Sequence, residues 1–248
     1  MSTAFLVLFH KAASLVDGLF FRSPVVLTYH SVSDGKTPLS VSVDGFRAQM
    51  ALLRRLGVRV LSAHDFLAIR SGAMPAPAKS VLITFDDAFQ DVALNALPIL
   101  EQFHFPAVVF INSGLIGGKA AFATLPWDRD RNVCSLDDLR ALSGGGVAIA
   151  NHSHSHKQLS ELSDAEIASE YKKTFDWIEK NIGENKYPDL FVFPKGAKNE
   201  RAKDVVRKAG ARVLDDRIDV YADTTLLKFV LRLSPCFLWL RRNLFLIH

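Results

Sequence analysis

Cysteine is scarce in this chain, with only Cys134 and Cys236 among 248 residues. Two cysteines give no disulfide framework. The pair fits reduced thiols in a cytosolic protein, with a single bridge between them as the alternative. Long apolar runs are missing as well, because no stretch reaches the roughly 20 residues of a membrane-spanning helix.

A continuous basic patch is also absent. Lysine and arginine exceed the acidic residues only by 30 to 26, which gives a net charge of +4. These basic residues are scattered apart from a few adjacent pairs, so we expect no nucleic acid among the partners. A hydrophobic content of 49% and a charged content of 23% fit one globular domain with a sizeable core.

Both ends of the chain have apolar character. On a helix, residues 3–21 gather a narrow polar arc opposite a broad apolar one. The positive start and the longer core of a secretory signal are missing, so we expect a cytoplasmic protein. The first interpretation of residues 1–23 is an amphipathic helix that closes the bottom of a barrel. The alternative is a helix that lies in a membrane interface, which the apolar and basic tail of residues 236–248 would join at the inner membrane face.

Between the ends, strand-like and helix-like segments alternate. Short apolar, β-branched runs predict strands near residues 25–28, 58–61, 80–84, 107–111, 147–150, 190–193 and 211–214. Helical spacing of apolar residues predicts helices near residues 43–56, 63–70, 93–103, 136–142, 163–182 and 200–209. Such βαβ alternation predicts a parallel sheet, open or closed as a barrel, in a domain of residues 24–235.

Polar motifs follow several of these strands directly. They are Tyr29-His30, Asp86-Asp87, the histidines of residues 152–156 and the Pro-Lys-Gly of residues 194–196. In α/β barrels the chemistry lies just past the carboxyl ends of the strands. The sequence therefore predicts one shared active site at that end of the sheet.

The composition of these motifs suggests a metal site. One carboxylate and two imidazoles with an open position form a usual ligand set for a catalytic divalent metal, and His152 and His156 are four residues apart. A second carboxylate beside the first is then available as a general base, which indicates a metal-dependent hydrolase. Each motif alone also fits turn-forming aspartates or solvated histidines, but their combination at one edge favours the metal site.

Four segments together resemble a known family. They are Thr84-Phe85-Asp86-Asp87, the Asn-His-Ser-His-Ser-His of residues 151–156, the Phe-Val-Phe-Pro-Lys-Gly of residues 191–196, and Tyr29-His30 near the start. In this order they are similar to the motifs of the polysaccharide deacetylases with a NodB homology domain, carbohydrate esterase family 4. The early Tyr-His pair resembles the branch that includes bacterial exopolysaccharide deacetylases. The resemblance covers roughly residues 24–215 and implies a distorted (β/α)7-8 barrel.

The resemblance also implies roles for single residues. Asp87, His152 and His156 would hold one divalent metal ion, with zinc first and cobalt, nickel or iron as alternatives. Asp86 would be the general base toward water, and His30 the general acid that protonates the leaving amine. The substrate and its developing oxyanion would meet four further residues, Tyr29, Pro194, Lys195 and Gly196.

Three positions depart from the family pattern. Ala88 replaces a glycine, and this alanine is strained if its backbone needs a positive φ. Lys195 stands where an aromatic residue is usual, which adds charge to the sugar-binding wall. Val192 stands where an arginine often orients the base aspartate. In addition, residues 117–131 lack clear periodicity and predict a loop at the rim, where substrate selection is expected.

These features predict an enzyme that removes an N-acetyl group, or else an N-formyl group, from an amino sugar. The expected partner is a polysaccharide or a glycolipid intermediate of surface glycan assembly. Two alternatives stay open: an amidohydrolase that acts on another amide, and a catalytically inactive protein that binds glycans.

Overall fold

The computed structural model describes residues 24–35, 37–123, 126–196, 199–215 and 217–219. The predicted helix of residues 1–23 and the predicted tail of residues 236–248 lie outside these ranges, as do residues 220–235 of the predicted domain. Within the described ranges, no helix has the length and apolar character needed to cross a membrane.

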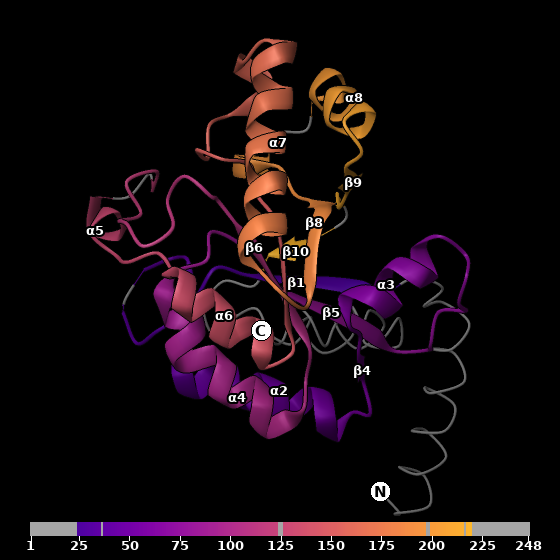
Figure 1. Ribbon diagram of the computed structural model, residues 1–248. Helices are drawn as coiled ribbons and strands as arrows, with labels where there is room; N and C mark the ends of the chain where they lie inside the picture. Colours follow the sequence, from indigo (N-terminus) through magenta and orange to yellow (C-terminus); the bar gives the residue numbers. More distant parts are fainter. Residues whose placement is uncertain (1–23, 36, 124–125, 197–198, 216, 220–248) are drawn as a thin grey trace, which may run out of the picture.

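A parallel sheet that curls into a half-barrel forms the centre of the molecule (Figure 1). In spatial order its strands are β10 (Ile218–Asp219), β1 (Val25–Tyr29), β5 (Ser80–Phe85), β6 (Ala107–Ile111), β7 (Val147–Asn151), β8 (Lys186–Phe191) and β9 (Arg212–Val213), with β4 (Arg59–Val60) paired to the start of β5. All of these pairings are parallel, so the carboxyl ends of the strands meet at one end of the sheet. The predicted distorted α/β barrel is confirmed.

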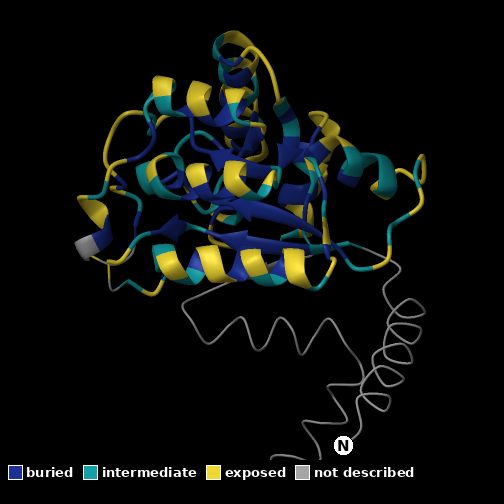
Figure 2. Ribbon diagram, turned by 90° about the horizontal axis from the view of Figure 1, so that it is seen from below, coloured by how far each residue is buried: buried dark blue, intermediate teal, exposed yellow. Residues whose placement is uncertain are grey.

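Each strand sends alternate side chains into two separate cores. The outer face of the sheet packs against α2 (Val43–Arg55), α4 (Leu97–Phe103) and α6 (Leu136–Gly144). The inner face packs against α3 (Ala63–Arg70), whose Phe66 contacts a cluster that includes Leu82 and Phe110. In Figure 2 the buried strands accordingly lie between helices whose outward sides are exposed. The period of two along a strand thus fixes which residues can reach the inside of the half-barrel.

Serine side chains cap the N-termini of several of the predicted helices. Ser42, Ser62, Ser135 and Ser163 each accept a hydrogen bond from the backbone N–H three residues later. A capping box starts α7 (Asp164–Asn181), since Glu166 also accepts from the Ser163 backbone N–H at 2.8 Å. On the outer face as well, α7 packs against β7 and β8, and it also contacts α8 (Glu200–Lys208).

The structure differs from the expected elements in several places. A short parallel pair, β2 (Ser31–Val32) and β3 (Ser40–Val41), follows His30. Strand β8 begins at Lys186, four residues before its predicted start. The predicted helix of residues 93–103 opens with a π-helical turn, η1 (Val92–Ala96), in which the N–H of Leu97 donates to the Val92 carbonyl. Pro98 follows at once and has no N–H, which fits a locally widened hydrogen-bond pattern.

We predict that Phe66→Ala lowers the free energy of unfolding by about 3–5 kcal/mol, because it empties the space between α3 and the inner face of the sheet. Phe66 is fully buried, whereas Leu94 is 62% exposed on η1. Leu94→Ala is therefore the matched control and should change the free energy by less than about 0.5 kcal/mol. Chemical denaturation measures both, and equal effects would contradict the assignment of α3 as the helix that fills the half-barrel.

Candidate active site

Strand alternation brings three of the predicted site residues to one place. His30, Asp86 and His152 each stand two positions beyond an inner-face position of β1, β5 or β7. The parallel register places Tyr29 opposite Phe85, and the backbone N–H of Asp86 donates to the Tyr29 carbonyl at 2.9 Å. The side chains that follow therefore open together at the carboxyl end of the half-barrel.

These side chains line a pocket of about 320 Å³. Its lining consists of His30, Leu39, Asp86, Asp87, Phe122, Ala123, His152, His156, Phe193, Lys195, Gly196 and Arg217. The prediction that the separate polar motifs share one site is confirmed. Apolar residues from three loops complete the walls, and of these only Leu39 lies outside the segments that the sequence analysis assigned to the site.

Asp87, His152 and His156 form a compact group of metal-ligand atoms. One atom from each lies within 4.8 Å of the others, and all three residues are buried. The Oδ1 atom of Asp87 lies 3.0 Å from Nε2 of His156 and 3.4 Å from Nε2 of His152. A carboxylate oxygen and two imidazole nitrogens that converge in this way fit a divalent cation.

The ring of His152 is oriented for such a role by the backbone. Its Nδ1 lies 3.0 Å from the Val192 carbonyl oxygen. Because a carbonyl only accepts, Nδ1 carries a proton, and Nε2 is the ring atom directed toward Asp87. Val192, which stands where an arginine is usual, thus orients one member of the metal-ligand group through its backbone carbonyl.

The charges in this group depend on one another. Burial raises the pKa of Asp87, but the two imidazoles against it hold that pKa well below its usual range. Burial lowers the pKa of His152, yet the adjacent Asp87 and Asp86 carboxylates more than offset this and raise it. The carboxylate therefore stays ionised, and a cation would take the place that a proton on the imidazole otherwise fills.

Asp86 has a basic partner that the sequence analysis did not identify. Nη1 of Arg217 donates to Oδ2 of Asp86 at 2.5 Å, and both side chains are largely buried. Burial raises the pKa of Asp86, but Arg217 first and then His152 and His30 bring it below its usual value. Val192 occupies the position of the usual orienting arginine, as expected, and a guanidinium from the segment directly before β10 contacts Asp86 instead.

Arg217 could not be found from local sequence. It lies 131 residues from Asp86, directly before β10. The only available signal is that Arg217 is the first basic residue after the last predicted strand, next to Asp215 and Asp216. The contact becomes evident only when β10 pairs with β1 and brings the two segments together.

A buried carboxylate holds the loop that carries the two histidines. Glu170 of α7 accepts hydrogen bonds from the backbone N–H groups of His154 and Ser155 at 3.0 and 2.8 Å, and from the Ser155 hydroxyl at 2.7 Å. The ring of His154 turns away from the metal-ligand group, and its Nδ1 lies 2.9 Å from the Ser113 hydroxyl. Glu170 therefore sets the position of the loop while His154 stays outside the pocket lining.

Backbone strain gathers around the pocket. Of the eight described non-glycine residues with positive φ, five belong to the site motifs: Asp87, Ala88, Ser153, His156 and Lys195. Ala88 has a φ of 51°, so the strain expected of an alanine at this position is confirmed. The turn is nevertheless held in place, because the Ala88 carbonyl accepts from the Cys134 N–H at 2.8 Å.

Two predicted site residues lie elsewhere. Tyr29 is 2% exposed, and its hydroxyl donates to Oε1 of Gln49 at 2.6 Å. It was expected beside the substrate, but its position in β1 has outer-face parity, so its ring packs against Phe46 and Phe85. Pro194 is buried beneath the loop and does not line the pocket, whereas its neighbours Lys195 and Gly196 do.

The predicted rim loop of residues 117–131 contributes to the site. It includes the short helix α5 (Pro126–Arg129), and its Phe122 ring lies 4.4 Å from the His156 ring, centroid to centroid. Arg131 fastens the loop, since it pairs with Asp128 at 2.9 Å and with Asp91, and lies over the Phe89 ring. Phe122 is thus held as an apolar wall of the pocket.

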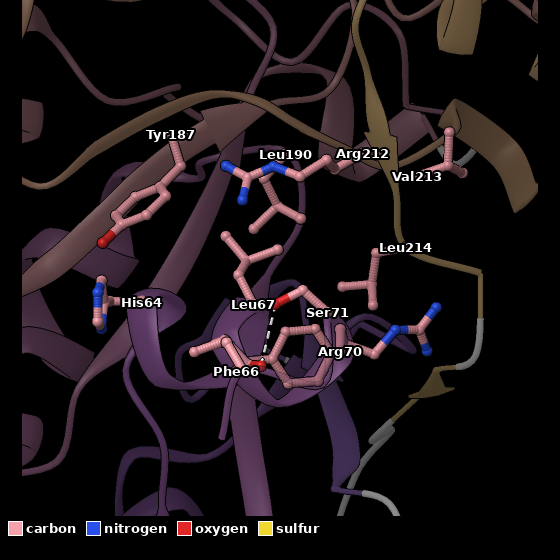
Figure 3. A pocket seen from close by; sticks show the side chains of 12 residues that line it. His64, Phe66, Leu67, Arg70, Ser71, Tyr187, Leu190, Arg212, Val213 and Leu214 are labelled. Atoms are coloured by element: carbon pink, nitrogen blue, oxygen red, sulfur yellow. Dashed lines mark hydrogen bonds between the residues drawn. The ribbon is translucent and has the colours of Figure 1, made fainter. Parts of the chain in front are cut away.

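A second and larger cavity, of about 530 Å³, lies between α3 and strands β8 and β9. Figure 3 shows Tyr187, Leu190 and Leu214 among the side chains around it. Among the residues that line it, His64 alone could act as a metal ligand. The chemistry therefore belongs to the smaller pocket.

We predict that Glu170→Gln weakens metal binding about 10- to 100-fold, the usual effect of losing a partner that orients metal ligands. The glutamine side chain would direct an amide donor toward backbone N–H groups that need an acceptor. Competition with a chelator would give the dissociation constant for Zn²⁺. Glu179→Gln on the same helix, at an exposed ion pair with Lys186, should leave this constant within about twofold; an equal effect of both changes would refute the role of Glu170.

Comparison with known proteins places the site in a family. The family model described as polysaccharide deacetylase matches residues 73–214, which is more than half of the chain. The chain is 28% identical over 182 residues to the poly-beta-1,6-N-acetyl-D-glucosamine N-deacetylase of Staphylococcus aureus (strain MRSA252), covering 70% of this chain and 59% of that protein. The chain spans about three fifths of the length of the first curated relatives it matches.

Solved structures support the same fold. IcaB from Ammonifex degensii is similar with a TM-score of 0.70 and 22% identity, covering 82% of this chain and 88% of that one. The Streptococcus pyogenes deacetylase PplD, in complex with acetate, has a TM-score of 0.68 and 20% identity, with coverage of 83% and 96%. The match to the family model, with the half-barrel fold, leads to one conclusion: the chain belongs to the polysaccharide deacetylase family.

Proposed function

We propose that this protein is a metal-dependent N-deacetylase that hydrolyses the N-acetyl group of an amino sugar in a polysaccharide or glycolipid. One observation carries the proposal: a single pocket holds Asp87, His152 and His156 beside the Asp86–Arg217 pair and His30. The printed name of the Staphylococcus aureus relative, a poly-N-acetylglucosamine N-deacetylase, supports the substrate class.

The metal-ligand group accounts for the hardest part of the reaction. An amide carbon is a poor electrophile, so its carbonyl has to be polarised before water can attack. When bound by Asp87, His152 and His156, a divalent cation supplies this Lewis acidity and makes water more acidic. The donor set suits Zn²⁺ first, with Co²⁺, Ni²⁺ and Fe²⁺ as alternatives.

The remaining residues move protons and hold charge. Asp86 is ionised, and its contact with Arg217 fixes the carboxylate, so it can take a proton from the attacking water. His30 lines the same pocket and donates a proton to the amine as it leaves. The backbone N–H at Lys195 is a further candidate donor toward the developing oxyanion.

The cellular setting stays a prediction. A cytoplasmic location and contact with the inner membrane face rest on residues 1–23 and 236–248, which lie outside the described ranges. Gentle lysis and fractionation would test both, and a chain found only in the soluble fraction would remove the membrane contact.

We predict that His152→Ala abolishes stoichiometric metal binding and acetate release together, because it removes one of three ligands. Elemental analysis and acetate release from an N-acetylglucosamine oligomer, measured on the same samples, would show this. His154→Ala is the matched control, since it changes a histidine of the same loop that lies outside the pocket lining, and it should keep both properties.

Other outcomes would redirect the proposal. Metal without acetate release would retain a hydrolase and point to formyl groups or to amides outside sugars. Wild-type protein that takes up no metal even after reconstitution would contradict the enzyme and favour a protein that only binds glycans.

We also predict that Arg217→Met lowers kcat about 10- to 100-fold while metal content is unchanged, because Asp86 loses the group that orients it. Arg217→Lys should recover part of the rate. Arg207→Met is a control at a half-exposed ion pair with Asp215 and should leave kcat as it is. A loss that appears only in KM, or an Arg217→Met protein with wild-type kcat, would show that Arg217 does not position the base.

A further inference from the structure

Lys195 stands apart from the other charged side chains of the pocket. Asp86 is paired with Arg217, and Asp87 lies against two imidazoles. Lys195 lines the same pocket and is exposed, and within the described residues it makes no hydrogen bond or ion pair. Lys195 is therefore a positive charge of the pocket lining that neither of its two carboxylates contacts.

Lys195 lies in its position with a strained backbone conformation. Its φ is 57°, in the left-handed region that glycine adopts more easily, and Gly196 follows at 61°. The preceding residues anchor the turn, because Pro194 is buried and the Phe193 ring packs edge-on against Phe191 at 5.0 Å. A strained residue on a fixed turn at a pocket wall is an arrangement typical of functional positions.

The rest of the wall is already suited to the uncharged part of a sugar. Leu39, Phe122 and Phe193 supply apolar surface, while the base, the acid and the metal-ligand group face the amide. At about 320 Å³ the pocket lies at the small end of ligand sites, so Lys195 is close to whatever sugar residue carries the amide. A bound divalent cation would make the net charge of the pocket positive.

We propose that Lys195 binds an anionic oxygen group, a phosphate or a carboxylate, carried by the substrate close to its N-acetyl group. The inference rests on the proposed function, since it names the substrate class of the same site. An ammonium group is a compact point charge that pairs well with such oxygens. The preferred substrate is then an anionic amino sugar, such as a glycosyl phosphate or a sugar next to a uronic acid, and not a neutral polymer.

Initial rates on four substrates would test this. We expect kcat/KM for N-acetylglucosamine 1-phosphate, for N-acetylglucosamine 6-phosphate or for a uronic-acid-linked N-acetyl disaccharide to exceed that for methyl N-acetylglucosaminide about tenfold. The compound with the largest excess identifies the position and source of the anion. Lys195→Gln keeps the backbone N–H and should remove the excess through KM, so that the ratio of kcat/KM between each anionic sugar and the neutral sugar falls to about one.

Two further variants separate charge from folding. Lys195→Arg keeps the charge and should keep the preference. Lys208→Gln changes an exposed lysine outside the pocket lining and should behave as wild type.

Binding is measured separately on the metal-loaded full chain with glucose 1-phosphate and methyl glucoside, which have no amide to hydrolyse. Wild type should bind the phosphate about tenfold more tightly, and Lys195→Gln should not.

The outcomes distinguish this inference from the proposed function. Acetate release from every sugar at equal kcat/KM in wild type and Lys195→Gln would overturn the anion site and leave the deacetylase intact. Absence of acetate from all substrates, with the binding preference present and dependent on Lys195, would overturn the deacetylase and support the anion site. A phosphate preference that persists in Lys195→Gln would assign it to the metal-ligand group and overturn the role of Lys195.

Discussion

The parallel register of β1 and β5 is the constraint on which the site depends. Tyr29 pairs with Phe85, so His30 and Asp86 leave the sheet side by side and on the same face. A slip of one residue would exchange the two faces of a strand. It would send the base or the acid toward the outer helices and bring an aromatic ring to the pocket. The apolar cores on both faces resist that slip, and in this way packing far from the pocket sets its chemistry.

The two adjacent aspartates of the pocket, Asp86 and Asp87, have separate partners. Arg217 and Asp86 form one pair, and Asp87 with its two imidazoles forms another, so the base and the metal ligand are adjacent in sequence but have different partners. Neighbouring carboxylates would otherwise raise each other's pKa. In the proposed reaction, this separation would leave Asp86 free to take a proton while Asp87 holds the metal ion.

Much of this arrangement could be read from the sequence. Apolar β-branched runs located the strands, and polar residues just beyond them located His30, Asp86 and His152, because both signals are local. Tyr29 was misplaced because strand parity had not been applied to it. Arg217 was missed because its partner lies 131 residues away and depends on the pairing of β10 with β1. Phe122 belongs to a loop held by Arg131, a tertiary contact that no periodicity reveals.

The left-handed turns at the site connect the stability of the folded protein to the binding of a metal ion. Each of the five non-glycine site residues with positive φ costs of order 1 kcal/mol. Together these costs are a sizeable part of the free energy of unfolding of a typical domain, which is roughly 5–15 kcal/mol. A cation that binds only the folded loops returns some of that energy. Scarcity of the metal would then lower the fraction of folded protein and expose more of the chain to proteolysis.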